Sequence, residues 1–168
     1  MSGKLRIGII GCGDFLRLRA ADLLSSRQVE VKLLYSPVNS ANAERYAEIF
    51  GAKAADSPEA IINDPEIDVV CVFVPPFVRK EYVLAAAKAG KQIVATKPLA
   101  ADLSDAREMT EAVEQAGVRC GVIYRRTNNP VIEAYKEIFS GGEFGKLALY
   151  KQDWLHHYPT WNRWATDP

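Results

Sequence analysis

One stretch of sequence decides the fold of this chain: Leu5-Arg6-Ile7-Gly8-Ile9-Ile10-Gly11-Cys12-Gly13-Asp14-Phe15-Leu16. Its first half is a short apolar run that stops at Gly11, as a buried strand does. From Asp14 to Ser25 the apolar residues recur at helical spacing. Glycines between the two segments allow a tight turn and a close approach of the backbone to another group. The stretch therefore predicts a strand, a turn and the start of a helix.

The same alternation continues along the chain. The pattern predicts further strands at 29–35, 68–74, 92–95 and 118–124, and helices at 41–50, 57–64, 77–89 and 104–116. Parallel strands need crossover connections, and strands that are apolar throughout are buried on both faces. We therefore predict an α/β fold with a doubly wound, mostly parallel sheet, which is the Rossmann dinucleotide-binding fold.

The organisation changes after Tyr124. A polar connection over 125–130 leads to a predicted helix at 131–139, and a further strand is expected to start near Lys146. The last residues contain all three tryptophans, and such an aromatic segment needs a surface to pack against: Trp154, Trp161 and Trp164. We predict a dinucleotide-binding domain over 1–124, and over 125–168 the start of an incomplete C-terminal α/β domain or a tail.

Composition excludes several classes of protein. The 168 residues are 48% hydrophobic and 25% charged, as in an ordinary globular protein, and 21 basic residues balance 21 acidic ones. This balance argues against nucleic acid or an anionic membrane as a main partner, and no apolar run has membrane-spanning length. Three widely spaced cysteines without a Cys-x-x-Cys pair predict no disulfide framework and no metal site. We expect a reduced, cytoplasmic protein.

The first turn is a candidate phosphate site. A helix N-terminus offers unpaired N–H groups and a partial positive charge, so a pyrophosphate fits there. Glycine turns are also common in purely structural links, but the strand–turn–helix context favours a dinucleotide. The third position of the pattern, usually Gly or Ala, is Leu16. Cys12 is expected to be a small buried residue. The candidate cofactor-binding residues are Gly11, Gly13, Asp14, Phe15 and Leu16.

The end of the second predicted strand is where an adenosine ribose would lie. An acidic residue there accepts hydrogen bonds from both ribose hydroxyls and repels a 2′-phosphate. This chain has no carboxylate between Ser36 and Glu44, and its hydroxyl and amide groups can donate to a phosphate. NADP is therefore favoured over NAD, although the segment can also be a simple turn that holds the ribose loosely. The candidates here are Ser36, Pro37 and Asn39.

Lys97 follows the strand predicted at 92–95, at the carboxyl edge where open parallel sheets bind ligands. Its ammonium group can hold a substrate hydroxyl, stabilise negative charge or relay a proton. The alternative is a solvent-exposed lysine in a turn, but Pro98 restricts Lys97 to extended backbone. Val74, Pro75 and Pro76 end the neighbouring strand and are further cofactor-binding candidates.

Several of these motifs, taken in order, resemble the glucose-fructose oxidoreductase/inositol dehydrogenase (Gfo/Idh/MocA) family. They are Gly11-Cys12-Gly13, Val74-Pro75-Pro76, Gly90-Lys91, Thr96-Lys97-Pro98-Leu99-Ala100, Tyr124-Arg125-Arg126 and Gly141-Gly142-Glu143-Phe144-Gly145-Lys146. The resemblance implies an NAD(P)-dependent oxidoreductase acting on a sugar, cyclitol or related polyol. It also implies oligomerisation through a second α/β domain, and it makes Lys97 the catalytic residue, with Thr96 and Arg125 near the cofactor.

The chain departs from that family in three respects. Thr96 stands where the family has a glutamate, and Pro76 and Arg79 stand where it often has Asn and His. The family's Asp/His constellation of the second domain has no counterpart, since His156 and His157 are neighbours without an evident partner. Two hypotheses follow: an oxidoreductase completed by another domain or subunit, or a non-catalytic dinucleotide-binding or interaction module.

Overall fold

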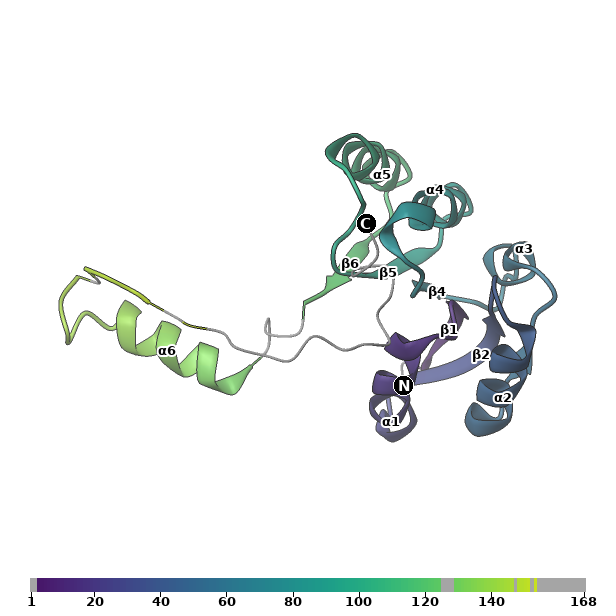
Figure 1. The fold of residues 1–168 in the computed structure, drawn as a ribbon, viewed down its shortest axis with the longest axis horizontal. Helices are drawn as coiled ribbons and strands as arrows, with labels where there is room; N and C mark the ends of the chain where they lie inside the picture. The colour runs from purple at the N-terminus through teal and green to yellow at the C-terminus, as the bar shows by residue number, and fades with distance from the viewer. Residues whose placement is uncertain (1–2, 125–128, 147, 152, 154–168) are drawn as a thin grey trace. The chain divides into compact units, whose positions relative to one another are not determined.

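The computed structural model describes residues 3–124, 129–146, 148–151 and 153. They fall into two compact units, 1–124 and 125–168. The first unit contains, in chain order, β1 (Leu5–Ile10), α1 (Asp14–Ser25), β2 (Val29–Tyr35), α2 (Ser40–Phe50), β3 (Lys53–Ala54), α3 (Pro58–Ile62), β4 (Val69–Val72), the 3-10 turn η1 (Pro76–Val78), α4 (Arg79–Lys88), β5 (Gln92–Thr96), α5 (Leu103–Gln115) and β6 (Cys120–Ile123) (Figure 1).

The six strands form one parallel sheet in the order β3-β2-β1-β4-β5-β6. From β1 the chain first extends the sheet outward through β2 and β3, and then resumes with β4 on the other side of β1. The strand order therefore reverses between β1 and β4, which creates a crevice at their carboxyl ends. This topology confirms the predicted Rossmann fold. The two-residue β3 escaped prediction because it is too short to show an alternation.

Helices cover both faces of the sheet (Figure 1). On one face, α1 and α2 pack on a core that includes Ile9, Leu16 and Leu34, all fully buried. On the other face, α3, α4 and α5 enclose a second core that includes Ile10 and Val70. Successive residues of a strand point to opposite faces, so burial on both sides explains why β1 and β4 are apolar throughout.

Local signals set the helix boundaries within one or two residues of the predictions. The side-chain oxygens of Asn39, Ser57 and Asp102 accept hydrogen bonds from the main-chain N–H groups of Ala41, Ala60 and Asp105, and so cap α2, α3 and α5. The helix predicted at 77–89 begins instead as η1 and becomes α-helical only at Arg79. Pro75 and Pro76 carry no N–H group, so the chain after β4 turns tightly before the helix starts.

The second unit contains α6 (Pro130–Ser140), which Asn129 caps. None of its residues is buried, and its apolar side chains recur at helical spacing. The strand expected to start near Lys146 is wrong for the described residues 148–151, which lie outside any strand. The tryptophans, Arg125 and both histidines lie outside the described residues.

Candidate functional site

The turn after β1 is tied to both neighbouring strands. The N–H of Gly11 donates to the main-chain oxygen of Tyr35 at 2.8 Å, and the N–H of Phe73 donates to that of Ile10 at 2.8 Å. Gly11 has a φ of +107°, which side chains rarely tolerate. The fold itself therefore requires this glycine, and the turn is fixed at the crevice between β1 and β4.

Gly13 differs from Gly11 in what surrounds it. It caps α1 with an ordinary φ of −92° and makes no side-chain cap hydrogen bond. A Cβ atom placed on Gly13 would meet no protein atom within 4 Å. The first helical hydrogen bond runs from the N–H of Arg17 to the oxygen of Gly13 at 3.1 Å, so the N–H groups before it have no helical acceptor. We call this open space with its uncapped N–H groups the cradle at Gly13, and an anion could be held there.

The next three residues divide between solvent and core. Asp14 is exposed and its carboxylate pairs with Arg17 at 3.1 Å. The ring of Phe15 packs edge-on against that of Phe73, with 4.8 Å between ring centres. Leu16 is fully buried and anchors α1 to the sheet. Any contact of Leu16 with a ligand would therefore come from its main chain.

Cys12 is a buried core residue of this turn. It is 2% exposed, and its thiol donates a weak hydrogen bond to the main-chain oxygen of Tyr35 at 3.5 Å. Burial raises the pKa of Cys12 to about 12, so the thiol is neutral and unreactive at physiological pH. The prediction of a small buried residue is confirmed.

The loop after β2 presents hydroxyl and amide groups without a carboxylate. The hydroxyl of Ser36 accepts from the N–H of Asn39 at 3.4 Å. Asn39 uses its side-chain oxygen to cap α2, which leaves its amide N–H groups as donors. The first turn of α2 contains no acidic residue. Pro37 is exposed, and so is Val38, which the sequence analysis did not single out.

The loop after β4 carries two apolar side chains that have no place in either core. Val74 and Pro76 are buried and Pro75 is half-buried, whereas Phe77 is 60% exposed and Val78 is 42% exposed. Phe77 and Val78 were predicted to begin the helix at 77–89 but lie in η1 instead. The sequence does place these two apolar residues directly after a strand and two prolines. Apolar side chains in such a connection are often exposed, because the connection does not pack on the core.

Lys97 is exposed directly after β5, while its neighbour Thr96 is buried. The Thr96 hydroxyl faces inward and accepts from the Arg79 guanidinium at 2.5 Å. The sequence identified Arg79 only as a departure from the family pattern and did not predict its buried position. Arg79 precedes Val83 by four residues on the buried face of α4, and that spacing was the signal.

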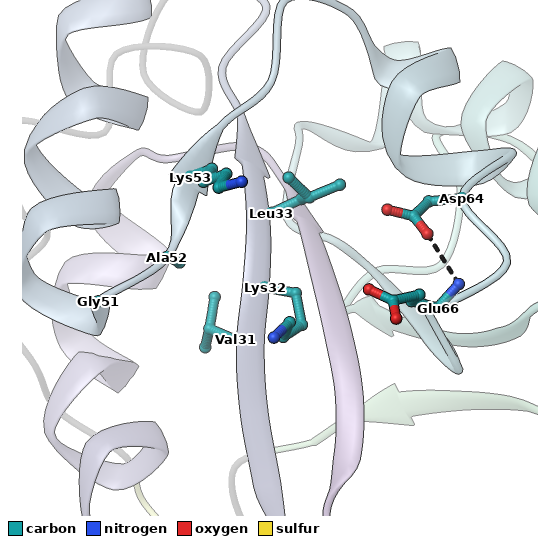
Figure 2. Close-up of a pocket in the computed structure, with 8 residues that line it drawn as sticks. All are labelled: Val31, Lys32, Leu33, Gly51, Ala52, Lys53, Asp64 and Glu66. Atoms are coloured by element: carbon teal, nitrogen blue, oxygen red, sulfur yellow. Dashed lines mark hydrogen bonds between the residues drawn. The ribbon is translucent and has the colours of Figure 1, made fainter.

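A separate hollow lies away from this edge (Figure 2). Lys32, Lys53, Asp64 and Glu66 are among its lining residues, near the amino-terminal ends of β3 and β4. The Asp64 carboxylate there accepts from the N–H of Glu66 at 2.7 Å. Ligands of open parallel sheets bind at the opposite, carboxyl edge. This hollow is therefore not part of the candidate site.

The geometry agrees with the comparison to known proteins. The model of the family described as "Oxidoreductase family, NAD-binding Rossmann fold" (GFO_IDH_MocA) matches residues 5–124. The chain therefore belongs to the Gfo/Idh/MocA family, as the motifs had suggested. Within the described residues, no helix is long and apolar enough to cross a membrane.

Curated relatives extend over most of this chain. An uncharacterised oxidoreductase of Streptococcus pneumoniae is 32% identical over 93% of the chain, which spans 42% of that protein. The scyllo-inositol 2-dehydrogenase (NAD(+)) of Bacillus subtilis is 29% identical over 90% of the chain, which spans 44% of it. The 1,5-anhydro-D-fructose reductase of Ensifer adhaerens is 31% identical over 84%, and the chain spans 42% of it. The chain thus spans less than half the length of these relatives.

Solved structures share the fold. A crystal structure described as a putative NADPH-dependent oxidoreductase from Desulfitobacterium hafniense superposes with a TM-score of 0.82 at 20% identity, covering 87% of this chain and 42% of that one. The 3-ketoreductase KijD10 of Actinomadura kijaniata, solved in complex with NADP, gives a TM-score of 0.76 at 26% identity. Coverage there is 84% of this chain and 45% of KijD10.

Proposed function

We propose that this chain forms the cofactor-binding part of an oxidoreductase that moves hydride between NADP(H) and a sugar, cyclitol or related polyol. The observation that carries the proposal is the cradle at Gly13. No neighbouring atom of the described residues and no positive φ requires a glycine there, yet its missing side chain leaves open space in front of uncapped N–H groups. A bound pyrophosphate explains both features, because it needs a close backbone approach and main-chain donors.

The preference for NADP rests on the loop after β2. A 2′-phosphate there would meet the Ser36 hydroxyl, the Asn39 amide and the N-terminus of α2, with no carboxylate to repel it. The loop also lacks an arginine, so the expected preference is modest. Val74, Pro75 and Pro76 would line the cofactor at the end of β4.

A nicotinamide dinucleotide supplies the hydride donor or acceptor when it is bound. The residue of this chain that would act on the substrate is Lys97, which is exposed directly after β5 at the carboxyl edge of the sheet. Its ammonium group would donate a hydrogen bond to the substrate oxygen and stabilise the negative charge that develops on it, while the hydroxyl proton is released to water as the carbon is oxidised. The named dehydrogenases and reductases among the relatives support a sugar or polyol as substrate.

The decisive experiment compares two glycine substitutions in calorimetric titrations with NADPH and with NADH. Gly13→Ala adds a methyl group to the cradle, and Gly121→Ala adds one to open space in β6, without strain at either position. We expect Gly13→Ala to weaken the binding of both dinucleotides by at least about tenfold and Gly121→Ala to change it by less than about twofold. Circular dichroism should show that both variants remain folded.

Each result has a definite meaning. Failure of the unmodified chain to bind either dinucleotide, or unchanged binding by Gly13→Ala, would overturn the cofactor site. Tighter binding of NADH than of NADPH would overturn the NADP preference and leave the rest in place. The substrate class is then tested by following nicotinamide absorbance with inositols, aldoses and simple alcohols, and with uncharged amines as the negative set. Turnover confined to the simple alcohols would contradict a sugar or polyol substrate.

A further inference from the structure

Arg79 is the one charged side chain that is buried in the described part of the chain. It is the first residue of α4 and only 1% exposed. No described carboxylate forms an ion pair with it. Burial lowers its pKa to about 10, so the guanidinium is still charged at neutral pH. A cation buried without a counter-ion costs free energy, and an apolar side chain of similar size would usually serve packing better.

The guanidinium is surrounded by main-chain oxygens from two loops. Its Nη1 donates to the carbonyl oxygens of Thr96 at 2.6 Å and Leu99 at 3.0 Å, and also to that of Pro98. Its Nη2 donates to the carbonyl oxygen of Val74 at 2.6 Å and to the Thr96 hydroxyl. The planar fork thus joins the end of β4 to the segment that follows β5, which the point charge of a lysine cannot do in the same way.

These contacts lie on both sides of Lys97. Thr96 precedes it and Pro98 and Leu99 follow it, and all three carbonyl oxygens turn inward to Arg79. Lys97 itself is exposed. The backbone on both sides of Lys97 is therefore held at three carbonyl groups, one before the lysine and two after it. Among the described residues the Nε of Arg79 has no hydrogen-bond partner, so this arrangement leaves one donor of the guanidinium unsatisfied.

We propose that Arg79 is a positioning residue, which clamps the 96–99 segment so that Lys97 projects from a fixed backbone at the carboxyl edge of the sheet. The proposal rests on the assignment of Lys97 under the proposed function. It adds that the orientation of Lys97 depends on a guanidinium bound to carbonyl groups rather than to a carboxylate.

The test uses the full chain with Arg79→Met, Arg79→Lys and the matched control Arg107→Met, which alters an exposed arginine on α5. Hydrogen exchange measures the protection of the backbone amides. Acetylation of lysines by acetic anhydride, with and without saturating NADPH, measures whether the bound dinucleotide covers the Lys97 side chain. Calorimetry with NADPH is run on each variant. A role in general stability would change the whole domain, whereas a clamp acts on one segment.

We expect Arg79→Met to raise amide exchange in 96–100 by at least about tenfold while amides of β1 keep their protection. NADPH should shield Lys97 from acetylation in the unmodified chain but no longer in Arg79→Met, although the affinity for NADPH stays within about threefold because the cradle at Gly13 is untouched. Arg79→Lys should give an intermediate result and Arg107→Met none.

Unchanged exchange in 96–100 together with full shielding in Arg79→Met would overturn the clamp. Should Arg79→Met fail to fold, Arg79→Lys decides the question, since it keeps a positive charge and three donors. Failure of NADPH to shield Lys97 in the unmodified chain would count against the proposed function instead, and the exchange rates would still decide the clamp.

Discussion

A Cβ atom on Gly11 would lie 2.7 Å from both the carbonyl carbon and the oxygen of Phe73, where β1 and β4 end. Main-chain atoms cannot move aside as a flexible side chain can. The same glycine has a φ of +107°, so two independent constraints act on it. The close packing of Gly11 against Phe73 therefore sets the backbone positions at the crevice between β1 and β4, where the proposed cofactor site lies.

Gly11→Ala is therefore expected to destabilise the fold by about 2–5 kcal/mol, the sum of backbone strain and overpacking. Urea unfolding followed by circular dichroism measures the loss. Gly13→Ala is the control, because it meets no neighbouring atom. Equal stability of the two variants would contradict the distinction between a glycine required by the fold and one that leaves room for a ligand.

A second glycine contact lies within the core. A Cβ on Gly8 in β1 would come 2.3 Å from Cγ2 of Ile61 in α3. We expect Gly8→Ala alone to cost about 1–3 kcal/mol, and Ile61→Ala alone about 2–5 kcal/mol through the cavity it leaves. In the double variant the new methyl group occupies part of that cavity. The two changes should then cost at least about 1 kcal/mol less than their sum in a double-mutant cycle, and strict additivity would refute the packing described here.

The sequence was sufficient for every strand of the sheet except β3, for the helices of the first unit and for the parallel arrangement, because burial on both faces leaves unbroken apolar runs such as β1 and β4. It also placed Gly11 and Gly13 in one turn, but it could not tell their roles apart. That distinction depends on Phe73, which is 62 residues away from Gly11 and is brought near only by the sheet. Local patterns carry no record of such contacts.

The contacts of Arg79 could likewise be predicted only in part. Its position on the buried face of α4 was visible in the spacing to Val83. The four carbonyl oxygens that bind it could not be predicted, because every residue type carries the same main-chain carbonyl group. For the same reason the inward orientation of the Thr96 hydroxyl followed only from the structure.

Acid should weaken the fold through Asp68. Its carboxylate accepts from the Nη2 of Arg6 at 2.9 Å and from the Arg6 main-chain N–H at 2.8 Å, and these hydrogen bonds lower the pKa of Asp68 to about 2. Because the pKa is lowered in the folded state, the stabilisation is complete above the unfolded value of 3.8 and is lost as pH falls toward 2.

We expect Asp68→Asn to be less stable than the unmodified chain at neutral pH and to lose less stability between about pH 4 and pH 2. Urea unfolding at several pH values measures both effects. The exposed Asp56 provides the control, since Asp56→Asn leaves the pair intact. Parallel pH profiles for the unmodified chain and Asp68→Asn would show that this carboxylate contributes nothing to acid sensitivity.

Coenzyme preference should respond to a single carboxylate at Ser36. Ser36→Asp would repel a 2′-phosphate and accept hydrogen bonds from the hydroxyls of an unphosphorylated ribose. We expect the affinity for NADPH to fall by at least about tenfold while that for NADH stays equal or rises. Ser36→Asn is the isosteric control without the charge, and an equal loss of NADPH affinity in both variants would place the effect in the shape of the loop.

Lys97 should separate turnover from cofactor binding. The cradle at Gly13 and the loop at Ser36 follow β1 and β2, whereas Lys97 follows β5, so Lys97→Ala is expected to leave NADPH affinity within about tenfold while turnover of the polyol substrate is abolished. Lys88→Ala, at the exposed end of α4, is the matched control and should keep full activity. Arg79→Lys adds the discriminating comparison. Because it disturbs the backbone beneath Lys97 without removing the ammonium group, its turnover number should fall between those of the unmodified chain and Lys97→Ala, with the Michaelis constant for NADPH unchanged. Full turnover by Lys97→Ala would remove the lysine from the reaction and leave this edge of the sheet as a binding surface alone.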